Sequence, residues 1–351
     1  MKFAICQELF EGWEWERQCE LIAEIGYTGI EAAPFTLAST IYELSADRRV
    51  ELRKQAEAHG LEIIGLHWLL AKTEGLYLTS PETPVRDATR DYVVALGEAC
   101  ADLGGDLMVF GSPAQRNLLE GVSREEAMGY AAEVFAGALP RLAELGVSIC
   151  MEPLTTNETD FIRTCAEAVE LIERVESATD ARNFLLHQDV KAMVGQETDP
   201  VPELVHRHAD RLGHFHVNDT NLLGPGMGET DFVPILGALE EIGYNGWVSV
   251  EVFDYAPGAE HISRTSFENL QQALAASREN RAAGSDRHGS LEIRHLVVVN
   301  RCRRLQFTER LKSCQLLGFL LVGTPCRGKS LVGNPGGDLE TLGVIRSLLV
   351  Q

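Results

Sequence analysis

Long apolar runs and paired cysteines are scarce in this sequence of 351 residues. The longest apolar run near the C-terminus, Leu316 to Val322, is too short to cross a bilayer. Charge resumes at Glu8 soon after Lys2, so we expect no signal peptide. The eight cysteines include no CxxC pair, and several stand inside apolar runs as buried free thiols do. These absences predict a cytoplasmic protein without disulfides and without a membrane partner.

Basic residues are few in the first 280 positions. Residues 281–351 hold 11 Lys and Arg against 5 Asp and Glu, which leaves residues 1–280 with 20 basic and 47 acidic side chains. So acidic a region repels phosphate backbones, and we expect no nucleic-acid partner. No basic cluster marks a phosphate pocket either. An unphosphorylated ligand is therefore expected.

A dinucleotide-binding fingerprint is also absent, because CQELFEGWEW follows the first expected strand where GxGxxG would stand. This absence disfavours an open doubly wound sheet and predicts no nucleotide cofactor. One literal GxxxxGKS match, Gly323 to Ser330, does follow an apolar run. However, Asn334 to Gly337 would break the helix that a phosphate-binding loop requires. We expect no nucleotide site there.

Short apolar runs alternate eight times with helical patterns over about 280 residues. The expected strands cover 2–6, 28–33, 61–66, 106–110, 147–151, 183–188, a run that begins at 212, and 247–250. The expected helices cover 13–25, 46–59, 81–103, 123–145, 163–176, 200–211, 232–242 and 262–281. This alternation predicts an α/β fold, a (β/α)8 TIM barrel over residues 1–282. Residues 283–351 are interpreted as a basic C-terminal extension, either disordered or non-native, or a tail that binds a partner.

Four metal-capable side chains stand at the ends of four consecutive expected strands: Glu152, Asp189, His216 and Glu251. Their separations of 37, 27 and 35 residues are each about one strand–helix unit. Because parallel strands of a barrel all end at the same face, we expect the four to meet at its mouth. A single strand-end carboxylate is usually a cap or part of an ion pair. Three carboxylates with one imidazole predict one divalent ion, which could be Mn²⁺, Mg²⁺, Co²⁺ or Zn²⁺.

Other polar residues near the same strand ends have two open interpretations each. His67 either faces the substrate or is a hydrogen-bonded structural histidine, and its neighbour Trp68 forms an apolar wall or simply packs. His187 shares a strand face with Asp189, so it either supports the site or fills a barrel layer. Asn218 and Asp219 either bind substrate or shape a loop. His214 shares a face with His216 but lies farther from the open end, and Glu31 is a weaker candidate.

Several short motifs accompany these residues and resemble one known family. They are MEPL at 151–154, NETD at 157–160, GHFH at 213–216, GPGMG at 224–228 and GYNG at 243–246. Together they resemble the xylose isomerase-like barrel family, which includes D-tagatose 3-epimerase, hydroxypyruvate isomerase and inosose dehydratase. The resemblance covers roughly residues 1–280. It implies that the four strand-end residues bind the metal, that Glu152 and Glu251 exchange a substrate proton through an enediolate, and that Glu158 contacts the substrate.

Two positions depart from the pattern of the epimerases that the sequence resembles. Ala192 stands where they carry a histidine, and Leu222 stands where they carry an arginine. Both missing groups contact substrate hydroxyls in that family, so activity on ketohexoses is in doubt. Lys191 either replaces one of these polar contacts or is an exposed lysine.

The resemblance predicts an isomerase or epimerase for an unphosphorylated sugar or polyol. The alternatives are an inosose-type dehydratase on the same scaffold and a non-catalytic sugar-binding barrel. A related abasic-site endonuclease is disfavoured by the acidic body. A homodimer or homotetramer is a further expectation that the sequence does not decide.

Overall fold

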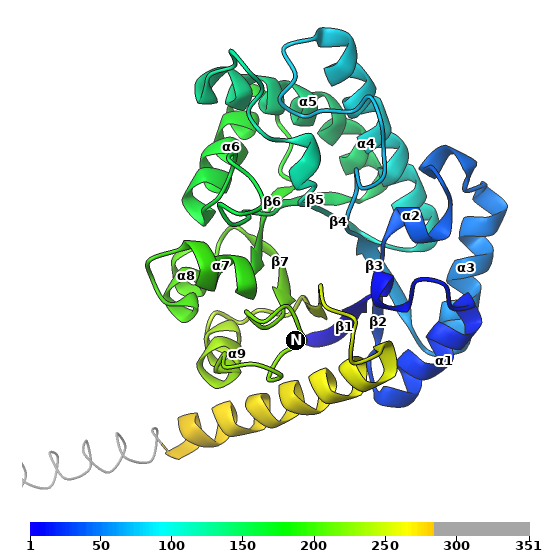
Figure 1. The fold of residues 1–351 in the computed structure, drawn as a ribbon, viewed down its shortest axis with the longest axis vertical. Helices are drawn as coiled ribbons and strands as arrows, with labels where there is room; N and C mark the ends of the chain where they lie inside the picture. The colour runs from blue at the N-terminus through cyan, green and yellow to red at the C-terminus, as the bar shows by residue number, and fades with distance from the viewer. Residues whose placement is uncertain (284–351) are drawn as a thin grey trace, which may run out of the picture. The chain divides into compact units, whose positions relative to one another are not determined.

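Eight parallel strands pair in chain order and close into a barrel in the part of the chain that the computed structural model describes, residues 1–283 (Figure 1). The strands are β1 (Lys2–Cys6), β2 (Gly29–Ala32), β3 (Glu62–Leu66), β4 (Leu107–Phe110), β5 (Ser148–Met151), β6 (Phe184–Asp189), β7 (Leu212–Val217) and β8 (Trp247–Val250). The predicted fold class is confirmed. Apart from its first residue, the predicted extension over 283–351 lies outside the described residues, as does the GxxxxGKS match. The domain boundary therefore stays a prediction.

Helices surround the barrel and connect its strands (Figure 1). The long ones are α1 (Trp15–Ile25), α3 (Ala46–Ala58), α4 (Thr83–Leu103), α5 (Arg124–Leu145), α6 (Cys165–Ala178), α9 (Phe232–Glu241) and a helix over 259–283. Short ones are α2 (Pro34–Leu37), α7 (Val190–Gln196), α8 (Val201–Arg207) and the 3-10 turns η1 (Gln7–Phe10), η2 (Ile41–Glu43) and η3 (Pro113–Gln115). No helix within residues 1–283 is long and apolar enough to cross a membrane.

The connection between β6 and β7 differs from the expectation. The helix expected over 200–211 is present as α8 but ends at Arg207, and a short helix that was not expected, α7, precedes it. The reason for α7 is local: the Asp189 carboxylate accepts a hydrogen bond from the backbone N–H of Ala192 and caps the helix. A strand-end residue therefore also starts a helix, which holds its side chain at the barrel mouth.

Helix ends follow signals that are visible in the sequence. Ser123 and Glu126 form a reciprocal capping box at the start of α5. At its other end Gly146 adopts a left-handed conformation with φ of 73°, which a residue without a Cβ accepts at little cost. These ends fix how long each helix is and where the next strand enters the barrel.

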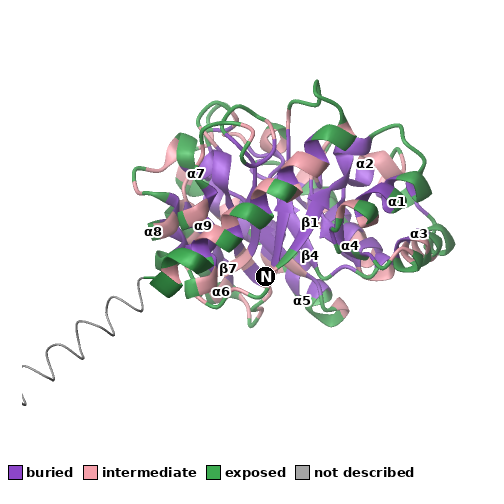
Figure 2. Ribbon diagram, turned by 90° about the horizontal axis from the view of Figure 1, so that it is seen from below, coloured by how far each residue is buried: buried purple, intermediate pink, exposed green. Residues whose placement is uncertain are grey.

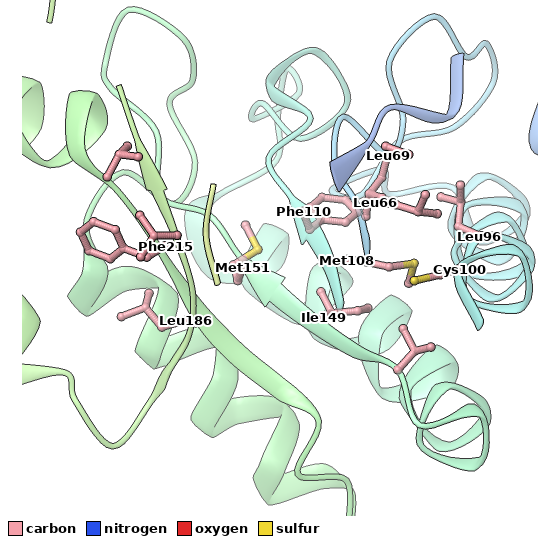
Figure 3. Packing of buried hydrophobic residues seen from close by; sticks show 14 of the residues in the cluster. Leu66, Leu69, Leu96, Cys100, Met108, Phe110, Ile149, Met151, Leu186 and Phe215 are labelled. Carbon is pink, nitrogen blue, oxygen red and sulfur yellow. The ribbon is translucent and has the colours of Figure 1, made fainter. Parts of the chain in front are cut away.

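The main apolar core lies between the barrel and its helices. Leu96 and Cys100 of α4 pack toward Met108 of β4, with Phe110 farther along that strand (Figure 3). Figure 2 shows the strands mostly buried, while the outer surfaces of the helices are exposed. The five cysteines within residues 1–283 are all buried and free, as the cysteine pattern predicted for them.

The barrel interior changes character from one end to the other. On β8, Trp247 is followed two residues later by Ser249 and two later again by Glu251, so all three share the inner face. The N-terminal end holds an apolar cluster, which we call the barrel floor: Ala4, Ile64, Leu107, Val109, Cys150 and Trp247. The next layers hold imidazoles and carboxylates. The alternation of side chains along each strand thus carries the chemistry to the C-terminal mouth.

Candidate active site

The four predicted ligands lie together at the C-terminal mouth. Glu152 follows β5, Asp189 ends β6, His216 belongs to β7 and Glu251 follows β8. One ligand atom from each lies within 4.8 Å of the others, and all four side chains are buried. The structure therefore brings together the four residues that the sequence singled out. Their roles as ligands stay a prediction.

The geometry of this cluster fits one divalent cation. His216 Nδ1 and Glu251 Oε2 are 3.1 Å apart, and two ligands about 2.1 Å from a shared ion at right angles would lie about 3 Å apart. Burial, together with the charges of Glu251 and Asp189, raises the pKa of Glu152 well above its ordinary value. A divalent ion would offset that repulsion. The donor set of three carboxylate groups and one imidazole suits oxygen-preferring or borderline metals.

A carboxylate outside the four predicted ligands, that of Glu31, orients the His216 ring through its Nε2 atom. Both oxygens of Glu31 lie 3.1 Å from His216 Nε2, and Glu31 Oε2 also lies 2.8 Å from His214 Nε2. Burial would raise the pKa of Glu31, but the neighbouring His216 and His214 hold it well below its ordinary value. Because Nε2 is engaged by Glu31, Nδ1 is the nitrogen left for a cation. The weaker candidate Glu31 thus lies in contact with a predicted ligand.

The two candidate catalytic glutamates have different surroundings. Glu251 accepts a hydrogen bond from Trp68 Nε1 at 2.9 Å on one oxygen and faces His216 with the other. Burial would raise the pKa of Glu251, but His216 and, more weakly, His67 and Lys191 lower it. No group within residues 1–283 donates a hydrogen bond to the Glu152 carboxylate. His187 Nε2 lies 3.8 Å from it, which is beyond hydrogen-bond range.

The backbone around Glu152 is held by residues that the sequence analysis missed. Arg116 is fully buried and donates to the carbonyl oxygen of Glu152 at 2.7 Å and to that of Ile162 at 2.9 Å. Burial lowers the pKa of Arg116 to about 10. A Cβ on Gly111 would overlap the Glu152 carboxylate, so a larger residue there would displace this carboxylate. The only sequence signal was the turn Gly111-Ser112-Pro113 before Arg116.

Asn218 and Lys191 are buried and link the predicted ligand Asp189 to Glu158. The Asn218 amide donates to the Asp189 carboxylate and accepts from the backbone N–H of Lys191 at 2.8 Å. The Lys191 ammonium donates to Glu158 at 2.8 Å and lies 3.9 Å from the centre of the Phe253 ring. Burial would lower the pKa of Lys191, but Asp189 and Glu158 raise it. This geometry favours a polar-contact role for Lys191 over that of an exposed lysine.

Two other candidates, His67 and His187, have their polar atoms engaged or enclosed. His67 Nε2 lies 2.6 Å from Glu8, which is a direct hydrogen bond and too close for the two to share a cation, and His67 Nδ1 is buried. Because His67 also lines a cavity beside Glu152 and Glu251, both of its alternatives stay open. His187 is fully buried beside the rings of His214 and His216, and neither of its nitrogens has a hydrogen-bond partner within the described residues.

Asp219 serves the loop that follows β7. Its oxygens accept hydrogen bonds from the backbone N–H groups of Thr220, Gly228 and Thr230. The Thr230 hydroxyl donates to it as well, at 2.8 Å. These bonds close the turn that contains the GPGMG motif. They favour the loop-shaping alternative for Asp219 over a substrate contact.

A cavity of about 350 Å³ opens beside Glu152 and Glu251. Its walls combine these carboxylates and Glu158 with apolar side chains, namely Trp68, Ala71, Pro113, Leu154 and Phe253. A second cavity of about 430 Å³ shares Glu158 and Phe253 with the first and is also lined by Lys191 and Leu222. A pocket with apolar walls and a few converging polar groups is typical of a small-molecule site.

Comparisons with known proteins agree with this geometry. The chain matches the family described as "Xylose isomerase-like TIM barrel" over residues 19–275. It is 33% identical over 113 residues to a D-psicose 3-epimerase of Ruminiclostridium cellulolyticum, a match that covers 31% of this chain and 35% of that relative. It is 26% identical over 271 residues to a putative hydroxypyruvate isomerase of Streptomyces coelicolor, covering 73% of this chain and 90% of the relative.

A solved structure supports the fold. The structure of an L-ribulose 3-epimerase superposes with a TM-score of 0.70 at 20% sequence identity, covering 82% of this chain and 99% of that one. At this identity the likeness shows the barrel alone. The D-psicose 3-epimerase match spans about a third of that relative's length. The activities of these relatives are therefore not transferred to this chain by similarity alone.

Proposed function

Because the chain belongs to the xylose isomerase-like TIM barrel family, we propose that it is a divalent-metal-dependent isomerase or epimerase of an unphosphorylated sugar or polyol. The observation that carries the proposal is the convergence of Glu152, Asp189, His216 and Glu251 within 4.8 Å. Two of these carboxylates also line a cavity with apolar walls. This arrangement suits proton transfer beside a carbonyl group.

Glu152 and Glu251 carry the proton in the proposed reaction. One carboxylate removes the proton from the carbon beside the carbonyl of a hydroxy-ketone or hydroxy-aldehyde, and an enediolate forms. For epimerisation, the other carboxylate delivers a proton to the opposite face of the same carbon. For isomerisation, a proton is delivered to the adjacent carbon and a hydroxyl proton passes between the two oxygens of the enediolate. A divalent cation held by the four residues would supply polarisation of the substrate carbonyl. The apolar side chains of Trp68, Leu154 and Phe253 limit water around the reacting carbon.

The charges around the cavities support an unphosphorylated substrate. Lys191 and Lys72 are the lysines that line them, and each is paired with a carboxylate, Glu158 and Glu11 respectively. Neither ammonium is left without a counter-charge for a phosphate. Ala192 is buried and Leu222 is partly exposed, and neither offers a hydrogen-bonding side chain. We therefore expect weak 3-epimerisation of ketohexoses and better activity on other hydroxy-ketones or hydroxy-aldehydes.

The test is solvent-deuterium incorporation by the full chain supplied with Mn²⁺, Mg²⁺ or Co²⁺. D-psicose, L-ribulose and hydroxypyruvate would be incubated in D2O and followed by NMR and mass spectrometry. We expect deuterium beside the carbonyl of at least one compound, together with its epimer or isomer. Isomerisation without deuterium uptake would argue against exchange through carboxylates.

Two other outcomes would replace the proposal. Loss of water from an inosose added to the same panel would move the assignment to the dehydratase alternative. Sugar binding without any turnover, measured by calorimetry on metal-loaded protein, would favour a non-catalytic barrel. Light scattering on the same sample would decide between a monomer, homodimer and homotetramer.

A further inference from the structure

Trp68 makes a hydrogen bond across the barrel mouth. It follows β3, whereas Glu251 follows β8, and β1 and β2 lie between these strands in the barrel. The indole Nε1 donates to Glu251 Oε1 at 2.9 Å. A hydrogen bond from a neutral donor to a carboxylate is stronger than one between neutral groups. Trp68 is thus more than an apolar wall of the cavity that its ring lines.

The backbone of Trp68 adopts a conformation that is unfavourable for a residue with a side chain. Its φ is 54°, in the left-handed region that residues with a Cβ disfavour. The flanking backbone is held on both sides: His67 N–H donates to the carbonyl of Ala32, and Leu70 N–H donates to the Ser112 hydroxyl. Disfavoured conformations that their surroundings enforce gather at functional sites. Here the conformation accompanies an indole N–H that reaches Glu251.

The two contacts on Glu251 fall on different oxygens. Trp68 holds Oε1, and His216 Nδ1 lies 3.1 Å from Oε2. Two partners on separate oxygens fix the plane of the carboxylate as well as its place. We infer that Trp68 is a positioning residue, whose indole N–H orients Glu251 toward the substrate. The contact itself is independent of the proposed function, whereas its consequence for proton transfer rests on that function.

The simpler alternative is that Trp68 only packs. Its ring centre lies 6.4 Å from that of Phe253 and 5.9 Å from that of Phe35, so the indole also belongs to an aromatic row along the mouth. Trp68→Phe keeps an aromatic ring in this row and removes the N–H. The matched control is Trp13→Phe, because Trp13 is partly exposed and its indole N–H has no hydrogen-bond acceptor within the described residues. The two variants lose the same group at different places.

The first experiment tests the contact without activity. The sequence has four tryptophans, so the full chain gives four indole N–H signals in a ¹⁵N–¹H NMR spectrum. The signal that disappears in Trp68→Phe belongs to Trp68, and we expect it downfield of the Trp13 signal. In Glu251→Gln it should move upfield, because a neutral amide oxygen is a weaker acceptor than a carboxylate. A Trp68 signal that does not respond to Glu251→Gln would overturn the inference.

The second experiment separates positioning from packing by kinetics. The assay uses whichever compound of the solvent-deuterium test reacts fastest. Trp68→Phe should lower its kcat about 10- to 100-fold, because misplacing a reacting group slows the chemical step. KM and the Mn²⁺ affinity measured by calorimetry should change less than 3-fold, and Trp13→Phe should leave all three unchanged. A raised KM with unchanged kcat would show that Trp68 only forms an apolar wall of the cavity and does not position Glu251. If no compound reacts but the NMR response to Glu251→Gln is present, the proposed function fails and the contact stands.

Discussion

The two ends of the barrel interior are built from the same alternating strands but hold opposite chemistry. At the floor, Ile64, Val109 and Trp247 pack against one another, and the Lys2 ammonium lies 3.7 Å from the Trp247 ring. At the mouth, buried carboxylates alternate with imidazoles, as in the pairs of Glu31 with His216 and Glu8 with His67. The floor supplies hydrophobic free energy, while the mouth keeps charges out of water. The floor should therefore govern stability and the mouth should govern chemistry.

The largest expected effect is a loss of turnover caused by substitutions at the mouth alone. Glu152→Gln and Glu251→Gln should each lower turnover about 100- to 10,000-fold, which is the usual contribution of positioned acid/base groups. Burial and nearby carboxylates disfavour the charged form of Glu152, so Glu152→Gln should not lower the melting temperature of the metal-free protein. Glu251→Gln should lower it, because His216, His67 and Lys191 stabilise the charged form of Glu251. Turnover, metal occupancy by elemental analysis and thermal melting would be measured on the same samples. Turnover within threefold of wild type in both variants would remove these glutamates from the mechanism.

The second effect is a loss of stability caused by a substitution at the floor alone. Ile64 is 3% exposed in the floor cluster, so Ile64→Ala should lower the free energy of unfolding by about 2–5 kcal/mol through lost burial and a residual cavity. Metal affinity should stay within a few-fold, because Ile64 belongs to the floor cluster, which contains none of the predicted ligands. Val194→Ala, at a position that is 48% exposed, is the control and should change stability by less than about 0.5 kcal/mol. Urea titration gives both values, and equal losses would show that the floor is not a tightly packed core.

The third effect lies at the boundary between the two regions. Glu31 orients His216 without being one of the four predicted ligands, so Glu31→Gln should weaken Mn²⁺ binding about 10- to 100-fold. Asp189→Asn removes a predicted ligand and should weaken binding at least as much. Calorimetry on metal-free protein would measure both affinities. Unchanged affinity in Asp189→Asn and in His216→Ala would contradict the four-ligand site.

Features set by the local sequence pattern could be predicted, whereas contacts between residues far apart in the sequence could not. Strand positions and the residues at their ends follow from an alternation that any reader can count, so Glu152, Asp189, His216 and Glu251 were predictable. The contact from Arg116 to the Glu152 carbonyl spans 36 residues, and that from Trp68 to Glu251 spans 183. Both depend on loop conformations that no periodicity encodes. The left-handed φ values of Trp68 and Ser112 are examples.

The same limit explains why the roles of the histidines could not be predicted. His67, His187 and His214 all follow the expected strand pattern, but alternation says only which face a side chain occupies. It does not say whether a nitrogen is already engaged, as His67 is by Glu8 and His214 is by Glu31. The alternatives for these residues therefore had to stay open until the layers above and below them were known.

The smallest expected effect concerns the described barrel and the rest of the chain. All eight strands and the helix that follows them lie within residues 1–283, which form one unit with its own core. A chain that ends at Ala283 should therefore keep a cooperative thermal transition within about 2 °C of the full chain, because the floor and the mouth are both complete in it. Its Mn²⁺ affinity should also match. The longer chain is the control, and both would be compared by circular dichroism and calorimetry. Loss of soluble, folded protein on this truncation would mean that residues beyond 283 contribute to the core or to an interface between subunits.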